Sequence, residues 1–311
     1  MKGRTLGKRA ELAAGRVAIA ALAKLSGKLN RERIGRWGTR LGDLAYFGSC
    51  RYRRVALANL AQAFPDWSQR DVRRTARETF RNFARGLLEF FYLQRVSPEE
   101  LDEWIMIEGA EHVDAALAKG QGIICVTAHL GNWEILARKL ARQGYRLSVI
   151  ARDSDDPETT RIINHVRENG GYKVLGRDSS ALAALRCLRK NELLGILPDQ
   201  NTLSGVFVEF FDRPVAAVTG PAVLALKTGA AIMCGFARRT PEGRFKAVVY
   251  PPLDLPHTGS EEGDVHALTA AFTRVIEAEI RKDPAQWLWL HDRWRRTAEA
   301  PGGSTVPETS S

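Results

Sequence analysis

A histidine and a glutamate stand five residues apart in the stretch TAHLGNWE, residues 127–134. The apolar run GIICVT leads into this stretch, and the charged helical pattern ILARKLARQG follows it. In a parallel α/β sheet, ligands bind beyond the carboxyl ends of the strands, and His129 falls just past such an end. A carboxylate bonded to one imidazole nitrogen fixes the tautomer and raises the basicity of the other nitrogen. The pair could therefore take a proton from a hydroxyl group.

The loop geometry decides whether the two side chains can meet. Continuous helix would place His129 and Glu134 about 140° apart around the helix axis. A turn at Leu130–Gly131, with a helix starting near Asn132, would instead let Glu134 reach back from the first helical turn. We therefore expect Glu134 to orient the imidazole. The alternative is that Glu134 only complements the helix dipole and that His129 is structural.

The remaining motifs limit the kinds of chemistry. No Ser or Cys stands in an elbow motif such as GxSxG, so direct activation of a substrate hydroxyl is favoured over a covalent enzyme intermediate. The four cysteines are widely spaced and form no Cys/His cluster, so the sequence offers no metal site. No motif calls for a cofactor.

Further candidate residues follow other expected strands. Arg152 follows YRLSVIA and suits a phosphate or a developing oxyanion, or a surface ion pair with Asp153 or Asp155. Asp199 and Gln200 follow the apolar run LLGILP and could bond hydroxyl groups of a substrate, with loop capping by Asp199 as the structural alternative. Arg213, in DRP, could bind an anionic headgroup or form a turn-anchoring salt bridge.

The elements that must position these residues change character along the chain. From about residue 104, short apolar runs alternate with helical patterns, which predicts an α/β fold with a largely parallel mixed sheet flanked by helices. We expect residues 1–103 to form a basic helical segment that associates with a membrane. Residues 104–297 should form the α/β catalytic domain, and residues 298–311 a disordered tail.

The positive charge is concentrated in the N-terminal segment. The whole chain of 311 residues carries a net charge of +10, and residues 1–60 alone contain 14 Lys and Arg against 3 Asp and Glu. Such a basic segment suits anionic lipid headgroups, nucleic acid or an acidic protein. The run VAIAALA, residues 17–23, is too short to span a membrane. It fits either a helix lying on a bilayer or a helix packed on the core of the protein.

Several blocks of the sequence, in order, resemble the bacterial lipid A late acyltransferases and their phosphatidylinositol-mannoside relatives, within the glycerolipid acyltransferase superfamily. The blocks are AHLGNWE, the helical region RYRRVALANLAQAFPDW, LLGILPDQN, FFDRPVAAVTGPAVLALKTGA and QWLWLHDRWRR. Together they cover about residues 51–296. The resemblance implies that His129 is a general base and Glu134 its orienting carboxylate. It also implies substrate-binding roles for residues of the matched blocks.

The resemblance implies an O-acyltransferase that moves a fatty acyl group from a thioester, on acyl carrier protein or CoA, to a hydroxyl of a membrane glycolipid or lipid. The resemblance implies that the protein lies at the cytoplasmic face of a bacterial inner membrane. It would be bound there peripherally or by one N-terminal amphipathic anchor. The alternative function is a non-catalytic protein that binds the membrane surface on an inherited scaffold. Nucleic acid is disfavoured as a partner because no recognised nucleic-acid-binding pattern is present. The acceptor and the acyl-chain length stay open.

Overall fold

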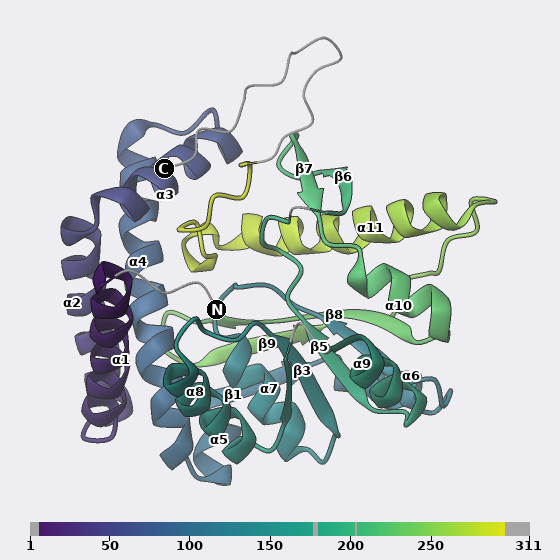
Figure 1. Ribbon diagram of the computed structural model, residues 1–311, viewed down its shortest axis with the longest axis horizontal. Coiled ribbons are helices and arrows are strands. Elements are labelled where there is room, and N and C mark those ends of the chain that lie inside the picture. Colours follow the sequence, from purple (N-terminus) through teal and green to yellow (C-terminus); the bar gives the residue numbers. More distant parts are fainter. Residues whose placement is uncertain (1–5, 177–179, 203, 296–311) are drawn as a thin grey trace.

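A mixed seven-stranded sheet forms the centre of the computed structural model, which describes residues 6–176, 180–202 and 204–295 (Figure 1). The strand order is β1-β9-β8-β2-β5-β3-β4, and β8 with β9 is the antiparallel pair in this order. The predicted fold class is therefore confirmed. The strands are β1 (Ile105–Glu108), β2 (Ile123–Val126), β3 (Leu147–Ala151), β4 (Lys173–Gly176), β5 (Leu193–Ile196), β8 (Ala231–Arg239) and β9 (Phe245–Val249).

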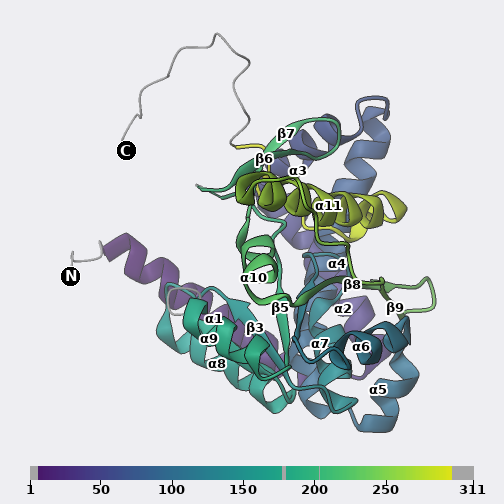
Figure 2. The same ribbon diagram turned by 90° about the vertical axis from the view of Figure 1, so that its right-hand side faces the viewer.

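Helices cover both faces of this sheet, and a short antiparallel hairpin stands apart from it (Figures 1 and 2). The hairpin strands are β6 (Val206–Glu209) and β7 (Pro214–Ala217). The helices that follow the N-terminal segment are α5 (Pro98–Trp104), α6 (Ala110–Leu117), α7 (Trp133–Arg142), α8 (Pro157–Asn169), α9 (Ser180–Arg189), α10 (Gly220–Thr228) and α11 (Glu261–Lys282). Two short 3-10 turns complete the described elements, η1 (Leu93–Arg95) and η3 (Pro284–Gln286).

Alternate residues of the strands supply two separate cores. In β2, Ile124 and Val126 pack with side chains of α9, α10 and α11 on one face of the sheet. Ile123 packs on the other face with Val113 of α6 and Tyr172. Strands buried on both faces read as continuous apolar runs, which explains why GIICVT shows no polar alternation. Because β2 is covered on both sides, the loop that follows it is held in a fixed place.

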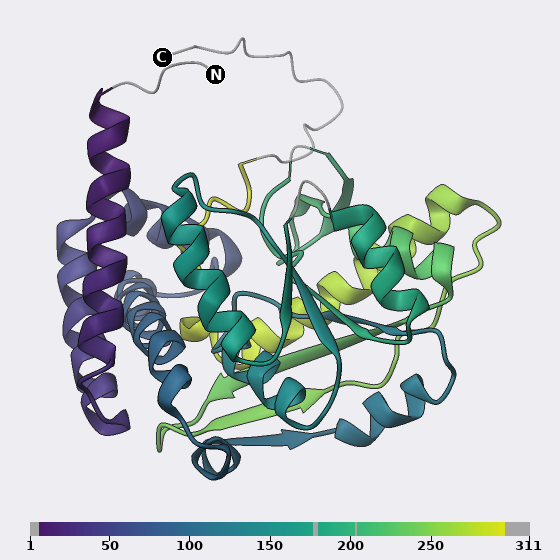
Figure 3. The ribbon, with the colours of Figure 1, turned by 60° about the horizontal axis from the view of Figure 1, so that its bottom comes forward.

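The N-terminal segment folds into four helices: α1 (Leu6–Ser26), α2 (Arg31–Gly48), α3 (Cys50–Ala63) and α4 (Gln69–Tyr92). Figure 3 shows α4 lying between the sheet and the outer helices α1 and α2. Gly38 and Gly42 let α2 pack closely on α4, because a Cβ atom at either position would overlap the backbone of Arg85 or Arg81. These glycines are packing contacts within one helix and do not interrupt it.

The apolar run of residues 17–23 packs on the protein itself. Ile19, Leu22 and Ala23 lie against Phe90 and other side chains of α4 and α8. The second of the two interpretations of this run therefore describes its inner face. No helix within the described ranges is long and apolar enough to cross a membrane.

The N-terminal helices also join the core of the α/β part. Asn59 of α3 donates hydrogen bonds to the backbone oxygens of Trp289 (2.9 Å) and His291 (2.7 Å). Asn82 of α4 donates to the oxygen of Ala285 at 3.0 Å. These bonds fix the C-terminal block against α3 and α4. The tail proposed for residues 298–311 lies outside the described residues.

Candidate active site

The loop after β2 turns as its sequence predicts. Gly131 has φ of +61°, and a Cβ atom there would overlap the carbonyl oxygen of Ala237. Asn132 caps α7, because its side-chain oxygen accepts a hydrogen bond of 3.0 Å from the backbone N–H of Ile135. The chain therefore leaves the sheet at His129 and enters α7 at Trp133.

Asp199 is the carboxylate that holds His129. Its Oδ1 lies 2.8 Å from His129 Nδ1, and its Oδ2 accepts a 2.8 Å hydrogen bond from the backbone N–H of His129. The indole Nε1 of Trp287 donates to the same Oδ2 at 2.8 Å. An ionised carboxylate only accepts hydrogen bonds, so the imidazole carries its proton on Nδ1 and leaves Nε2 free to accept one.

The charge state of Asp199 follows from these contacts. Burial by itself would raise the pKa of this carboxyl group, whose side chain is only 1% exposed. The charge and hydrogen bonds of His129, with the bond from Trp287, outweigh burial and lower the pKa of Asp199 to about 2. Asp199 is therefore ionised at neutral pH.

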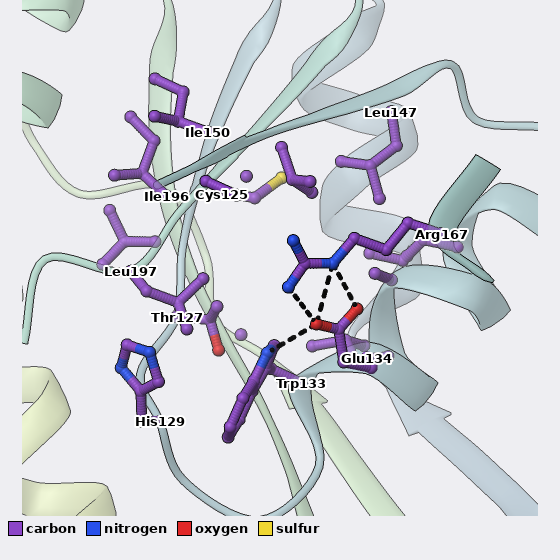
Figure 4. Close-up of a pocket in the computed structure, with 18 of the residues that line it drawn as sticks. Cys125, Thr127, His129, Trp133, Glu134, Leu147, Ile150, Arg167, Ile196 and Leu197 are labelled. Atoms are coloured by element: carbon purple, nitrogen blue, oxygen red, sulfur yellow. Dashed lines mark hydrogen bonds and ion pairs between the residues drawn. The ribbon is translucent and has the colours of Figure 1, made fainter. Parts of the chain in front are cut away.

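Glu134 binds elsewhere, which corrects the expected His129–Glu134 contact. Its carboxylate accepts hydrogen bonds from Arg167 Nη2 (2.6 Å), Tyr172 Oη (2.5 Å) and Trp133 Nε1 (3.1 Å). Figure 4 shows the Trp133 ring between His129 and the Glu134–Arg167 ion pair. Since α7 begins at Trp133, its first turn aims Glu134 toward α8 and away from the imidazole.

Trp133 contacts both His129 and Glu134. Its ring meets the His129 ring edge to face, with the ring centres 4.9 Å apart. Burial raises the pKa of the Tyr172 hydroxyl well above its usual value, and the neighbouring Glu134 carboxylate raises it further. Tyr172 thus stays a neutral donor, and with Arg167 it fixes Glu134 and the ring of Trp133 beside His129.

A cavity of about 460 Å³ opens beside the free face of His129. Its mouth is polar, with Arg152, Ser154, Gln200 and Asn201 among the lining residues. The interior lies between the sheet, α7 and α8, and its wall is mostly apolar, although the Glu134–Arg167 ion pair also lines it. The interior wall includes Cys125, Leu136, Ala137, Leu140, Leu147, Val149, Gly195, Met233 and Val249. Figure 4 shows Thr127 and Leu197 on the side of His129, and Cys125 and Leu147 farther from it. The shape suits a polar reacting group attached to an apolar chain.

The structure brings Gln200 to this site. The Gln200 side-chain amide nitrogen lies 3.5 Å from His129 Nε2, at the mouth of the cavity. Arg152 also lines the mouth, where its guanidinium lies 3.7 Å from Asp155 with 73% of the side chain exposed. Such an exposed pair is weak, so Arg152 can exchange Asp155 for an anionic ligand group.

Arg213 lies away from the cavity walls. The backbone N–H and carbonyl of Arg213 pair with those of Phe210 across a tight turn, in which Phe211 and Asp212 have φ of +52° and +57°. The turn is held further by Glu277, which accepts a 2.7 Å bond from the N–H of Phe211. The backbone of Arg213 belongs to this turn, and the salt bridge expected of its guanidinium stays a prediction.

The loop that carries Asp199 and Gln200 is held from behind by two residues of the C-terminal block. Arg293, only 1% exposed, donates to the carbonyl oxygens of Ala216 (2.7 Å) and Gln200 (3.4 Å). Burial lowers the pKa of Arg293 to about 10. His291 Nε2 accepts a 2.7 Å bond from the N–H of Asn201, and burial lowers the pKa of this imidazole, which favours its neutral form.

Sequence reasoning placed Asp199 at the correct edge of the sheet but gave it another contact. It did not identify Trp133, Arg167, Tyr172 or Trp287 as members of the site. Trp287 is buried, at 2% exposure, and it binds Asp199. Within the described ranges, no group of three His, Cys, Asp or Glu side chains could hold a metal ion.

Comparison with known proteins gives concordant matches. The family model for bacterial lipid A biosynthesis acyltransferases matches residues 9–296. The chain is 27% identical over 270 residues to the lipid A biosynthesis lauroyltransferase of Escherichia coli (strain K12), covering 86% of each chain. It is 33% identical over 225 residues to the phosphatidylinositol mannoside acyltransferase of Mycobacterium tuberculosis (strain ATCC 25618 / H37Rv), covering 68% of each. A lipid A biosynthesis palmitoleoyltransferase of Escherichia coli (strain K12) is 24% identical over 266 residues.

Proposed function

Because this chain belongs to the bacterial lipid A biosynthesis acyltransferase family and is an acyltransferase, we propose that it transfers a fatty acyl group from a thioester to a hydroxyl of a membrane glycolipid. The donor thioester is carried by acyl carrier protein or CoA. The observation that carries the proposal is His129, held by Asp199 through Nδ1 and facing a cavity with an apolar interior. We place the enzyme at the cytoplasmic face of the inner membrane, on an anionic lipid surface.

In the proposed reaction, Nε2 of His129 takes the proton of the acceptor hydroxyl as its oxygen attacks the thioester carbonyl carbon. The new C–O bond forms a tetrahedral oxyanion. When this intermediate collapses, the C–S bond breaks and the imidazolium returns its proton to the departing sulfur. The products are the ester and the free thiol. Asp199 keeps the imidazole in the required tautomer and stabilises the imidazolium.

We assign roles to the other site residues from their contacts and from their places in the cavity. Gln200 and Arg152, at the cavity mouth, face the reacting groups, and their donors suit the oxyanion or an anionic part of either substrate. The acyl chain occupies the apolar interior between the sheet and α7. Glu134 acts as a positioning residue through Trp133 and Arg167, and does not bond to the imidazole in the resting site.

The test of the catalytic role replaces His129 with alanine. We expect His129→Ala to abolish transfer while the far-UV circular dichroism stays nearly unchanged, because Gly131, Asn132 and the backbone bond to Asp199 still hold the loop. The melting temperature should fall, because the buried Asp199 carboxylate loses its imidazole partner. His165→Ala is the matched control, since His165 is exposed on α8 and bonds only locally to Asn169. Retained turnover in His129→Ala would refute the assignment.

The acceptor is identified by mass spectrometry of envelope lipids from cells with and without the gene. We expect one lipid class to lose the mass of one acyl group. Restoration by the wild-type gene and not by His129→Ala would tie the missing acyl group to this site. An unchanged set of lipids would contradict the proposed acceptor class and favour a non-catalytic role at the membrane.

A further inference from the structure

Large apolar side chains are exposed along α2 and at the start of α3. The exposed fractions are 39% for Trp37, 70% for Leu44, 61% for Phe47 and 52% for Tyr52. In contrast, the inner face of the apolar run in α1 is used in packing against α4 and α8. Of the exposed large apolar side chains described in the N-terminal segment, three lie on α2, and one each lies on α1 (Val17), α3 (Tyr52) and α4 (Phe83).

The large apolar and most of the basic exposed residues of α2 lie on one side of the helix. At 100° per residue, six of them fall within an arc of about 100°, directly opposite the buried residues Ile34, Gly38, Gly42 and Tyr46. We call this surface the α2 face. Its members are Arg33, Arg36, Trp37, Arg40, Leu44 and Phe47, all of them exposed.

The α2 face mixes cations with apolar groups and contains no acidic residue. The two acidic residues of α2 lie beside the arc and are paired: Asp43 with Arg77 and Arg81 of α4, at 2.7 and 2.6 Å, and Glu32 with Arg36, at 3.4 Å. The guanidinium of Arg40 lies 5.7 Å from the centre of the Trp37 ring. The net charge of the face is therefore positive.

We propose that the α2 face, extended by Arg51 and Tyr52 of α3, docks the protein on an anionic phospholipid bilayer. The proposal deepens the proposed function, on which it rests for the identity of the acceptor as a membrane lipid. Trp37, Leu44 and Phe47 enter the boundary between headgroups and acyl chains, as the apolar side of an interfacial helix does. The arginines bind the lipid phosphates.

The position of α2 in the fold agrees with such contact. Figures 1 and 3 place α2 at the outer side of the molecule, with α4 between it and the sheet. A bilayer can therefore reach the whole length of the helix. None of the six residues lines the cavity that contains His129, so substitutions on the α2 face leave the reacting groups in place.

The first measurement is sedimentation of the full chain with vesicles of phosphatidylglycerol and phosphatidylcholine in equal parts, against vesicles of phosphatidylcholine alone. Wild-type protein should bind the anionic vesicles, and added salt should weaken that binding. The variant Trp37→Ser/Leu44→Ser/Phe47→Ser should bind at least about ten-fold more weakly, because three apolar groups no longer leave water.

Two matched controls separate this surface from general exposure of apolar groups. Leu182→Ser on α9 and Met106→Ser on β1 remove side chains that are 67% and 62% exposed and lie on other elements. Both should bind vesicles like wild type. Val17→Ser on α1 should also have little effect, although Val17 is 66% exposed. Loss of binding in Val17→Ser with normal binding of the triple variant would assign docking to α1 and overturn the proposal.

The charge contribution is tested by Arg33→Gln/Arg36→Gln/Arg40→Gln. This variant should lose the preference for anionic vesicles and most of the salt dependence. Equal vesicle binding by wild type and both triple variants would overturn the proposal. Binding of wild type to mixed DNA or RNA at physiological salt, without vesicle binding, would overturn it in favour of nucleic acid.

Acyl transfer in detergent micelles tests the proposed function separately from the proposed docking by the α2 face. Both triple variants should transfer the acyl group to dispersed acceptor at the wild-type rate, because the cavity is untouched. Failure of wild type to transfer in micelles would contradict the proposed function and leave vesicle docking standing. Normal transfer with vesicle binding insensitive to the α2 substitutions would contradict only the docking face.

Discussion

Three donors hold the carboxylate of Asp199, and together they set the charge of the group behind His129. The backbone and imidazole N–H groups of His129 and the indole N–H of Trp287 all point to this one side chain. Removal of the negative charge would leave the imidazolium without its partner in a nearly closed space. At the scale of residues, the activity therefore depends on Asp199 as well as on His129.

The pH dependence of stability follows from the pKa of Asp199, which is lowered from 3.8 to about 2. A carboxyl whose pKa is lower in the folded chain stabilises the fold fully above its unfolded pKa and loses that contribution as the pH falls toward the folded value. A shift of this size corresponds to about 2 kcal/mol. We expect the gap in unfolding free energy between wild type and Asp199→Asn to be largest above about pH 4 and to narrow toward pH 2.

Denaturant titrations at several pH values measure this difference in unfolding free energy. Asp199→Asn should also lose transfer activity by on the order of 10³-fold or more. Glu134→Gln is the comparison, since it removes a charge that Arg167 and Tyr172 hold away from the imidazole. It should lower activity less than Asp199→Asn. A gap independent of pH, or a larger loss in Glu134→Gln, would contradict the roles given to the two carboxylates.

The partner of His129 could have been found from the order of neighbouring strands. In the register of β2 and β5, Val126 lies beside Ile196, so three residues further on in each strand His129 lies beside Asp199. The sequence predicted both strand ends but not that they are neighbours, because strand order depends on distant packing. The contact with Glu134 was expected from nearness along the chain, and the direction of the first turn of α7 prevented it.

At the scale of elements, the alternation of short apolar runs and helical patterns predicted the largely parallel mixed sheet. It missed β7, whose four residues begin with a proline and pair only with β6. In the fold, Gly38 and Gly42 mark the close contact between α2 and α4, which no local pattern reveals.

The loop between β2 and α7 depends on Gly131. An alanine there would need a left-handed backbone and would overlap the carbonyl oxygen of Ala237. We expect Gly131→Ala to lower the unfolding free energy by several kcal/mol, on the order of 3 kcal/mol, and to lower activity by displacing His129.

The matched control is Gly144→Ala. Gly144 also has a positive φ, of +96°, but a Cβ atom there would meet nothing within 4 Å. Its cost should therefore be limited to backbone strain, about 1 kcal/mol. Chemical denaturation of both variants gives the comparison. Equal costs would show that the contact with Ala237 is unimportant.

At the scale of the whole molecule, the cavity beside His129 lies against the sheet, and we propose that it holds the acyl chain. Gly195 of β5 lies in its wall next to Cys125 of β2, and a Cβ atom there would lie 3.1 Å from a methyl group of Val149. We expect Gly195→Leu to fill the deeper part of the cavity. It should shift preference toward shorter acyl donors.

Competition among thioester donors of increasing chain length measures this preference. The rate with the shortest donors should stay close to wild type, because His129 and Gln200 are not displaced. An unchanged preference, or an equal loss for all donors, would place the acyl chain outside this cavity.

The buried carboxylate of Glu89 joins three parts of the chain. It lies on α4, and it accepts hydrogen bonds from Arg239 at the end of β8 and from Asn132, the residue that caps α7. Loss of α4 would strand the guanidinium of Arg239 in the interior and free the side chain that begins α7. The N-terminal helices and the loop between β2 and α7 should therefore unfold in one cooperative step. Substrates should accordingly enter the site while the N-terminal helices stay packed on the α/β part.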